Sequence, residues 1–325
     1  MNMRIGTEER KHLREMLGEN IRFDEPMSRH TSFRAGGPAA AYASPDSKEK
    51  LLNLIRWAAE QEFPHSIVGD GTNLLVKDSG YPGIIIVLTK CLRETEIIRE
   101  ENDGRVIIRA GAGVRMKSLC RFAMQNRLEG ISPLLGIPGT VGGGIWMNAG
   151  TSRGEIADIL HTVTVLSPDG NIRQIDRQNL CFTYRKLIWS REHVSSEGKK
   201  PVIAEGDFVL HKSMKTVAEL DSEAQMILAQ RHRSQPLEFP SAGCFFKNPA
   251  SGRSAGELID RAELKGARVG GAEVSAKHAN FIINRNRASA SDILSLADMV
   301  KNRVAELFGI ELEREVKVIG QSVYP

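Results

Sequence analysis

Apolar residues recur at helical spacing in several stretches of the sequence. The clearest run lies in residues 51–58 and gives one apolar face to a helix that begins at Asp46 and ends near Phe63. Asp46 and Glu49 have the spacing of a capping box, which predicts where this helix begins. The pattern also predicts helices in residues 1–20, 116–122, 218–231 and after Ser254. A long amphipathic helix is expected to begin at a capping box of Ser289 and Asp292 and to end at Gly309, a natural C-cap.

Other segments have the apolar runs of β-strands. Residues 84–88 are all apolar, which is typical of a strand buried on both faces of a sheet. Residues 97–98 and 106–108 flank Asn102-Asp103-Gly104, and residues 162–166 and 172–175 flank Pro168-Asp169-Gly170, so each pair predicts a hairpin. Shorter strands are expected at 66–68, 202–204, 208–210, 279–283 and 315–318, and residues 234–240, with two prolines, predict a rigid extended linker.

The stretch from Leu135 to Gly150 has a different pattern. It contains six glycines and one proline and no charged residue. A solvated linker would be polar, so we expect a buried loop. Glycines let the backbone approach a flat or anionic ligand and leave N–H groups free to bind it. A tight interior turn is the alternative, but this density of glycine favours a ligand loop.

A second glycine-bearing turn, Gly69 to Asn73, follows the strand expected at 66–68. A turn in this position suits a phosphate bound by backbone N–H groups, with Thr72 and Asn73 as side-chain donors. The turn has neither the Gly-Lys-Ser/Thr of a Walker loop nor a full dinucleotide fingerprint. Arg34, before two glycines, offers a guanidinium for the same kind of ligand, and a surface arginine is the equal alternative.

Length and charge exclude several classes of protein. A chain of 325 residues suits two or three domains. The net charge of +4 is small and the basic residues are scattered, which argues against a nucleic-acid partner. No apolar run is long enough to cross a membrane, and the charged N-terminus is unlike a signal peptide. The four cysteines are widely spaced, without a metal-ligand pattern, and indicate a reduced, cytoplasmic protein: Cys91, Cys120, Cys181 and Cys244.

Three further positions carry side chains suited to chemistry. Cys244 follows a small-residue turn and precedes Lys247, and a free thiol near a cation can donate a proton or act as a nucleophile. Arg185 follows Tyr184 and can hold a carboxylate in a bidentate fork. Alternation places Glu315 on the polar face of its strand. Each has a plainer alternative that is locally favoured: a buried structural cysteine, a surface arginine and a solvated strand face.

Taken together and in order, these segments resemble the MurB family, the UDP-N-acetylenolpyruvoylglucosamine reductases of bacterial cell-wall synthesis. The resemblance extends from about residue 22 to residue 320 and lies in seven segments: 31–34, 69–73, 136–150, 183–185, 243–249, 278–284 and 315–320. Each segment alone is a weak signal, but their combination is specific.

The resemblance implies an α+β chain with an FAD-binding fold of the vanillyl-alcohol-oxidase (PCMH) type, in two α/β subdomains, and a C-terminal α+β substrate-binding domain. The implied units are an N-terminal helical extension (1–20), a first subdomain (21–88, with a returning strand at 312–325), a second subdomain (89–213) and the substrate-binding domain (214–311). The chain passes from Pro249 directly to Ser254 and so resembles the type II subgroup, which lacks an extra tyrosine-bearing loop. We expect a monomer.

The family reaction, as the resemblance implies it, has two halves. NADPH gives a hydride to N5 of non-covalent FAD, and N5 then gives a hydride to C3 of the enolpyruvyl group of UDP-N-acetylglucosamine enolpyruvate, which yields UDP-N-acetylmuramate. Negative charge develops at C2 and spreads into the carboxylate, where positive or donor groups lower the barrier. Arg185 and Glu315 match the family residues that assist there, and a glutamate beside a carboxylate is pushed towards its protonated form.

The resemblance assigns the other site residues by position, and it implies no metal. Substrate binding falls to Tyr184, Lys247, Asn248, His278 and either Arg231 or Arg233, and a structural role is the equal alternative for His278. Cofactor binding falls to Arg34, Gly69, Asp70, Gly71, Thr72, Asn73, Gly136, Ile137, Pro138, Gly139, Thr140, Gly142, Gly143, Asn148, Ala149 and Gly150.

Cys244 departs from the family pattern, which usually has a serine here as the proton donor to C2. A thiol with an ordinary pKa of about 8.5 is mostly protonated at neutral pH and is a better acid than a hydroxyl, so we expect Cys244 to donate. A pKa lowered by Arg185 or Lys247 would instead make it a thiolate that cannot donate.

Two other functions stay open. The same fold suits an FAD-dependent alcohol oxidase or dehydrogenase, but no covalent-flavin motif is recognisable, and the set of Arg185, Cys244 and Glu315 fits the reductase better. A non-catalytic nucleotide-binding regulator would not need all three groups.

Overall fold

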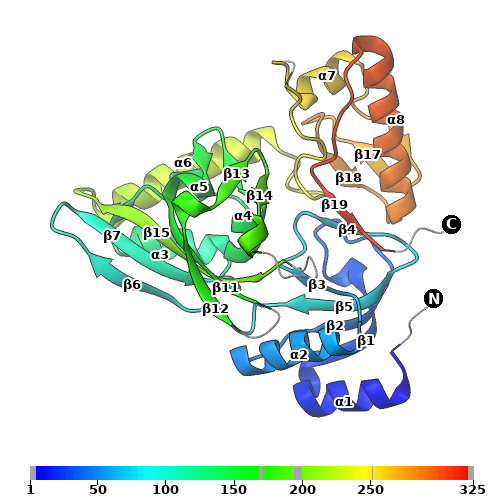
Figure 1. The fold of residues 1–325 in the computed structure, drawn as a ribbon. Coiled ribbons are helices and arrows are strands. Elements are labelled where there is room, and N and C mark those ends of the chain that lie inside the picture. The colour runs from blue at the N-terminus through cyan, green and yellow to red at the C-terminus, as the bar shows by residue number, and fades with distance from the viewer. Residues whose placement is uncertain (1–4, 168–170, 194–199, 251, 321–325) are drawn as a thin grey trace.

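The computed structural model describes residues 5–167, 171–193, 200–250 and 252–320, which form three parts (Figure 1). The first part has a four-stranded sheet in the order β1-β2-β5-β3, in which β5 pairs in parallel with β2 and β3. The predicted apolar strand at 84–88 is confirmed as part of β5, except that β5 ends at Val87. The elements of the first part are α1 (Thr7–Leu17), β1 (Ile21–Pro26), β2 (Pro38–Ala43), α2 (Lys48–Glu60), β3 (His65–Val68), β4 (Leu74–Val76) and β5 (Tyr81–Val87).

Two details of this part differ from the prediction. The cap of α2 is Ser47, whose side chain accepts a hydrogen bond from the Lys50 N–H, so the predicted cap at Asp46 is wrong by one residue. Asp46 instead forms an ion pair with Lys50. Helix α1 is more than a peripheral extension, because Leu13 and Leu17 are buried in the core beneath α2.

The second part is a six-stranded antiparallel sheet, β12-β11-β15-β7-β6, with β8 beside β15. Both predicted hairpins are confirmed, as β6–β7 and β11–β12. Residues 168–170, in the turn predicted for the second hairpin, lie outside the described residues, as do residues 194–199. The two strands predicted at 202–210 form one strand. The elements are β6 (Thr95–Glu100), β7 (Arg105–Gly111), α3 (Met116–Gln125), β8 (Leu128–Glu129), α4 (Val141–Met147), β9 (Gly150–Thr151), β10 (Gly154–Glu155), α5 (Ile156–Ile159), β11 (Leu160–Leu166), β12 (Ile172–Asp176), β13 (Cys181–Thr183), β14 (Lys186–Ile188), β15 (Val202–Lys212) and α6 (Val217–Ser234).

The glycine stretch is only partly a buried loop. Gly136 and Pro138 are exposed, and residues 141–147 form α4, which Thr140 caps by accepting a hydrogen bond from the Gly143 N–H. A Cβ at Gly142 would lie 2.8 Å from the Cβ of Ala112 and 3.3 Å from its carbonyl oxygen, so close packing of α4 on the segment after β7 favours a glycine here. The prediction of an irregular loop is therefore wrong for α4, and packing explains part of its glycine content.

The third part contains α7 (Ala255–Arg261), a sheet of β16 (Arg268–Val269), β17 (Ala272–Val274) and β18 (Ile282–Asn284), and α8 (Ala290–Phe308). The capping box of Ser289 and Asp292 and the left-handed Gly309 are confirmed at the two ends of α8. The chain then returns to the first part, where β19 (Lys317–Ile319) pairs in parallel with β4 (red strand in Figure 1). Because β19 is shorter than predicted, Glu315 lies in the segment before it.

The junction of the third part differs from the predicted boundary. Helix α6 packs against α3, and Ala224 of α6 belongs to the core that the first and second parts share. The boundary predicted at residue 214 would assign α6 to the third part, whereas α6 packs on the second part. Residues 234–240 are not a simple extended linker, since the Phe239 N–H bonds to the Pro236 carbonyl in a turn. The third part also buries Phe33 and Leu75 of the first part in its own core.

Candidate active site

Three backbone segments meet at the edge where the first and second parts face each other. The Ser32 N–H donates to the Gly71 carbonyl at 3.1 Å, and the Thr72 hydroxyl donates to the Pro138 carbonyl at 3.5 Å. A Cβ at Gly69 would lie 2.6 Å from the Thr140 hydroxyl. The structure thus brings together segments 69–73 and 136–143, to which the sequence assigned cofactor binding, and segment 31–34, in which it assigned Arg34 alone.

The surface at this edge suits a nucleotide cofactor. Gly71 has φ +65°, and a Cβ there would lie 2.0 Å from the His30 carbonyl oxygen, so only glycine fits. Among the described residues, nothing accepts a hydrogen bond from the N–H groups of Gly71 and Thr72, and such free donors are what a pyrophosphate binds. A Cβ at Gly143 would meet nothing nearer than 3.5 Å, which leaves that glycine's face open to a ligand.

The structure uses some of the predicted cofactor residues differently. The Val141 and Gly142 N–H groups at the start of α4 donate to carbonyls of 112–114, so this helix end is not an open anion site. The Asp70 carboxylate pairs with Arg115 at 3.1 Å, and the Asn73 side chain donates to the Glu315 carbonyl. Arg34 is exposed beside Gly36, with a left-handed φ of 53°.

A second group of residues adjoins this edge at Asn73, whose side chain donates to the Glu315 carbonyl, and forms the substrate end of the edge. Tyr184 and Arg185 form the two-residue turn between β13 and β14. The Arg185 guanidinium donates to the Glu315 carboxylate at 3.0 Å and to the Gly150 carbonyl at 3.1 Å. Both charged side chains are about four-fifths buried, at 21% and 16% exposure, so their attraction is only weakly screened by water.

Cys244 joins the same group from the third part. Its segment is held on one side by a bridge to Phe281 and on the other by the Glu315 N–H, which donates to the Phe245 carbonyl at 2.8 Å. Burial, with the nearby charge of Glu315, raises the pKa of the Cys244 thiol to about 11, against the opposing effect of Arg185 and Arg231. Cys244 is therefore a thiol at neutral pH, and the thiolate considered from the sequence does not form.

The Glu315 carboxyl has a raised pKa as well. Burial is the main cause, and the Arg185 guanidinium opposes it. The direction is the one predicted from the sequence, but a desolvated site produces it here without a second carboxylate beside it.

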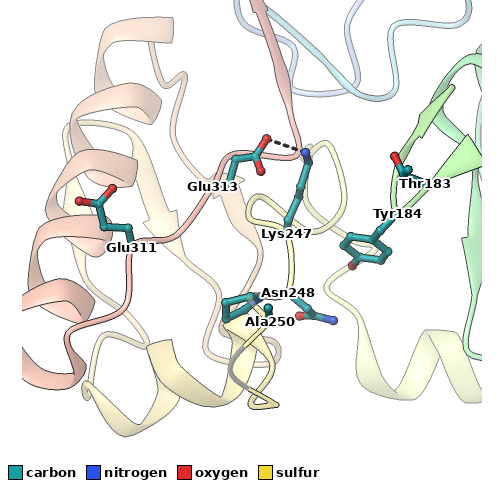
Figure 2. Close-up of a pocket in the computed structure, with 8 residues that line it drawn as sticks. Thr183, Tyr184, Lys247, Asn248, Ala250, Glu311 and Glu313 are labelled. Atoms are coloured by element: carbon teal, nitrogen blue, oxygen red, sulfur yellow. Dashed lines mark hydrogen bonds and ion pairs between the residues drawn. The ribbon is translucent and has the colours of Figure 1, made fainter. Parts of the chain in front are cut away.

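A cavity of about 380 Å³ is lined by residues close to this group along the chain (Figure 2). Tyr184 faces it from the β13–β14 turn, Lys247 and Asn248 from the loop after Cys244, and Glu313 from the segment before Glu315. The Lys247 ammonium pairs with the Glu313 carboxylate at 2.5 Å. Three residues predicted to bind substrate thus share one cavity, and Glu313 and Glu311 are lining residues that the sequence reasoning missed.

The other predicted substrate residues differ in their positions. Arg231 of α6 is partly buried over Gly136, with the arginine Cδ 2.9 Å from where a Cβ of that glycine would be. Arg233 is exposed. The His278 ring accepts a hydrogen bond from the Asn280 N–H and packs on Phe281 at 4.8 Å, which favours the structural alternative. In the part of the chain that the structure describes, no cluster of ligands suits a metal ion and no helix could span a membrane.

Comparisons with known proteins match both halves of this arrangement. Residues 39–176 match the FAD binding domain family, and residues 235–319 match the family described as UDP-N-acetylenolpyruvoylglucosamine reductase, C-terminal domain. Proteins named UDP-N-acetylenolpyruvoylglucosamine reductase from Desulfosudis oleivorans and Heliobacterium modesticaldum are each 41% identical to this chain. The first alignment covers 96% of this chain and 98% of the relative, and the second covers 92% and 90%.

A solved structure is also similar. The crystal structure of UDP-N-acetylenolpyruvylglucosamine reductase (MurB) from Thermus caldophilus matches with a TM-score of 0.71 at 33% identity, over 90% of this chain and 97% of that one.

Proposed function

Because this chain belongs to the UDP-N-acetylenolpyruvoylglucosamine reductase family, we propose that it uses NADPH to reduce UDP-N-acetylglucosamine enolpyruvate to UDP-N-acetylmuramate, a precursor of peptidoglycan. The chain is an FAD-binding oxidoreductase, and its FAD-binding domain has the fold class predicted from the sequence. One observation supports the proposed reaction above all others: Arg185, Cys244 and Glu315 come together from three distant segments. Residues close to them along the chain, Tyr184, Lys247 and Glu313, line a cavity.

The flavin site is the edge formed by segments 31–34, 69–73 and 136–143. When bound, FAD supplies the redox chemistry, accepting a hydride from a nicotinamide and delivering one to carbon. The N–H groups of Gly71 and Thr72 would hold its pyrophosphate, and the open face of Gly143 would admit its rings.

Arg185 and Glu315 act on the substrate carboxylate. The guanidinium that now pairs with Glu315 is the group that can take the carboxylate in a bidentate contact. Arrival of that second carboxylate favours protonation of Glu315, whose pKa burial already raises. A protonated Glu315 then donates a hydrogen bond, so both residues stabilise the negative charge that reduction develops.

Cys244 provides the proton that C2 needs. Its S–H bond breaks as the C2–H bond forms, the electron pair of the S–H bond stays on sulfur, and the thiolate later takes a proton from water. A pKa of about 11 keeps the proton on the thiol before the reaction. The nearby Arg185 and Arg231 guanidinium groups stabilise the thiolate once it forms.

Lys247, Asn248 and Tyr184 would hold the rest of the nucleotide sugar in the cavity. An ammonium is a suitable point charge for a diphosphate. Lys247 must then release Glu313, with which it is paired without substrate.

An anaerobic experiment in two steps tests the proposal. NADPH is added to the purified yellow protein until the flavin absorbance is lost, and UDP-N-acetylglucosamine enolpyruvate is then added. Return of the flavin absorbance is expected, with formation of UDP-N-acetylmuramate. UDP-N-acetylglucosamine serves as the control, because it lacks the double bond.

The other outcomes identify the step that is wrong. Flavin that is reduced by NADPH and stays reduced would contradict either the substrate or the role of Cys244. Flavin that is bleached by simple alcohols, and not by NADPH, would support the alcohol oxidase alternative.

A further inference from the structure

Asn148 is completely buried, so its side chain does not face the flavin edge to which the sequence assigned it. Its Nδ2 donates to the Thr183 carbonyl at 3.1 Å, and its Oδ1 accepts from the Ala157 N–H at 3.3 Å. Both polar atoms of the amide are thus used within the protein. The residue also ends α4 in the left-handed region, with φ 44°.

The bond to Thr183 reaches the turn that carries Arg185. Thr183 and Lys186 are the paired residues that close this turn, and Arg185 has a left-handed φ of 58°. Such a backbone conformation is unfavourable for a residue other than glycine. A hairpin of two short strands is also only marginally stable alone. The turn therefore needs contacts from outside the hairpin to hold the arginine in this conformation.

Segment 148–150 supplies those contacts at two points. Asn148 holds the backbone before the turn, and the Gly150 carbonyl accepts a hydrogen bond from the Arg185 guanidinium. The guanidinium is then aimed at Glu315.

We propose that Asn148 is a positioning residue for Arg185: its side-chain amide fixes the Tyr184–Arg185 turn so that the guanidinium meets the substrate carboxylate. This inference rests on the proposed function for its kinetic consequence. Its structural part, an anchored turn, stands independently of the substrate.

The first test uses Asn148→Asp and Asn148→Gly. Asn148→Gly removes the donor to Thr183, and Asn148→Asp removes it while the new carboxyl is ionised. Both variants tolerate the left-handed backbone. With FAD bound, we expect either variant to slow reoxidation of the flavin by substrate about 10-fold or more, because one well-placed hydrogen bond in a catalytic site is lost. Reduction by NADPH should change less than about 2-fold. Equal slowing of both halves, or weaker FAD binding alone, would show that Asn148 serves the cofactor.

A double-mutant cycle with Arg185→Lys shows whether the effect acts through the arginine. If Asn148 works by positioning Arg185, Asn148→Gly has little further effect in the Arg185→Lys background. Fully multiplicative losses would overturn the proposal.

The Asn148→Asp variant also has an internal rescue. A buried aspartic acid has a raised pKa, and its protonated carboxyl can donate to the Thr183 carbonyl. The rate of the substrate half-reaction, taken relative to the native protein at each pH, should therefore rise for Asn148→Asp as the pH falls. It should stay flat for Asn148→Gly. The same relative profile for both variants would contradict a role for the donated hydrogen bond.

A measurement without substrate separates this inference from the proposed function. Hydrogen exchange of backbone amides in residues 181–188 should be faster in Asn148→Gly with FAD bound. Thr162→Val is the matched control, since it removes a buried hydroxyl that donates a hydrogen bond to Asp207 within the six-stranded sheet of the second part. Unchanged exchange in Asn148→Gly would overturn the proposal, whereas failure of native flavin to be reoxidised would overturn only the proposed function.

Discussion

The two ends of the active-site edge are built in different ways. At the flavin end, backbone meets backbone, and the spacing between segments depends on the absence of side chains at Gly69 and Gly71. At the substrate end, hydrogen bonds and ion pairs hold Arg185, Cys244 and Glu315 in a partly desolvated environment. One end is thus specified by shape and the other by charge and hydrogen bonding.

This difference indicates what each end tolerates. Added atoms at the flavin end force segments apart, and binding and folding suffer together. Exchanged side chains at the substrate end leave the backbone in place, so one half-reaction changes without the other. Variants at the two ends test this distinction.

The largest effect is expected for Gly71→Ala. The new Cβ would lie 2.0 Å from the His30 carbonyl oxygen, in a left-handed backbone. Gly104→Ala is the control, because Gly104 has a similar φ of +86° and an added Cβ there would have nothing within 4 Å. We expect Gly104→Ala to cost about 1–2 kcal/mol of unfolding free energy, and Gly71→Ala to cost more and to lose FAD. Equal costs, measured by denaturant unfolding, would contradict specification by shape.

Arg185→Ala is expected to have the next largest effect. Loss of the guanidinium should slow reoxidation of flavin by substrate about 10²- to 10³-fold, as for removal of one charge-stabilising donor. Reduction by NADPH should be nearly unchanged in stopped-flow measurements. Arg303→Ala, at a surface ion pair with Glu306, is the control. Equal slowing of both half-reactions would mean that the two ends are not separate.

Cys244→Ala should slow the same half-reaction about 10²-fold, within the usual range for loss of a general acid. Cys244→Ser should keep substantial turnover, since a hydroxyl can still deliver a proton. Fast reoxidation in Cys244→Ala would show that another group protonates C2.

The pH dependence of Cys244 gives a smaller and more specific effect. Burial disfavours the thiolate, so deprotonation should occur near pH 11 and not near 8.5. The difference in thiolate ultraviolet absorbance between the native protein and Cys244→Ser measures this titration. Because the charge of Glu315 contributes to the raised pKa, Glu315→Gln should lower it. An unchanged or higher pKa in Glu315→Gln would contradict that coupling.

The smallest effect is expected for Glu313→Gln. Glu313 is 74% exposed and pairs with Lys247, so its removal should free the lysine and lower KM for substrate about 2- to 5-fold, in line with the modest strength of exposed ion pairs. Glu311→Gln is the matched control, because Glu311 lines the same cavity and pairs with Lys301. A raised KM in Glu313→Gln would show that Glu313 binds substrate.

Features that depend on near neighbours along the chain were predictable without the structure. The caps of α8, both large hairpins and the apolar strand β5 follow from spacing, turn residues and apolar runs, which act within a few residues. The types of chemical group at positions 185, 244 and 315 were also evident, together with their order along the chain.

Only the tertiary structure decided how those groups act. Arg185 and Glu315 are 130 positions apart and meet because β19 returns to β4. The pKa of Cys244 depends on burial and on the charges of distant residues, Glu315, Arg185 and Arg231, which no local pattern encodes. Asn148 was assigned to the cofactor from its place in a glycine-rich stretch, but its amide is used by Thr183 and Ala157. Desolvation and long-range hydrogen bonds arise only when distant segments pack, and these interactions set the chemistry of the site.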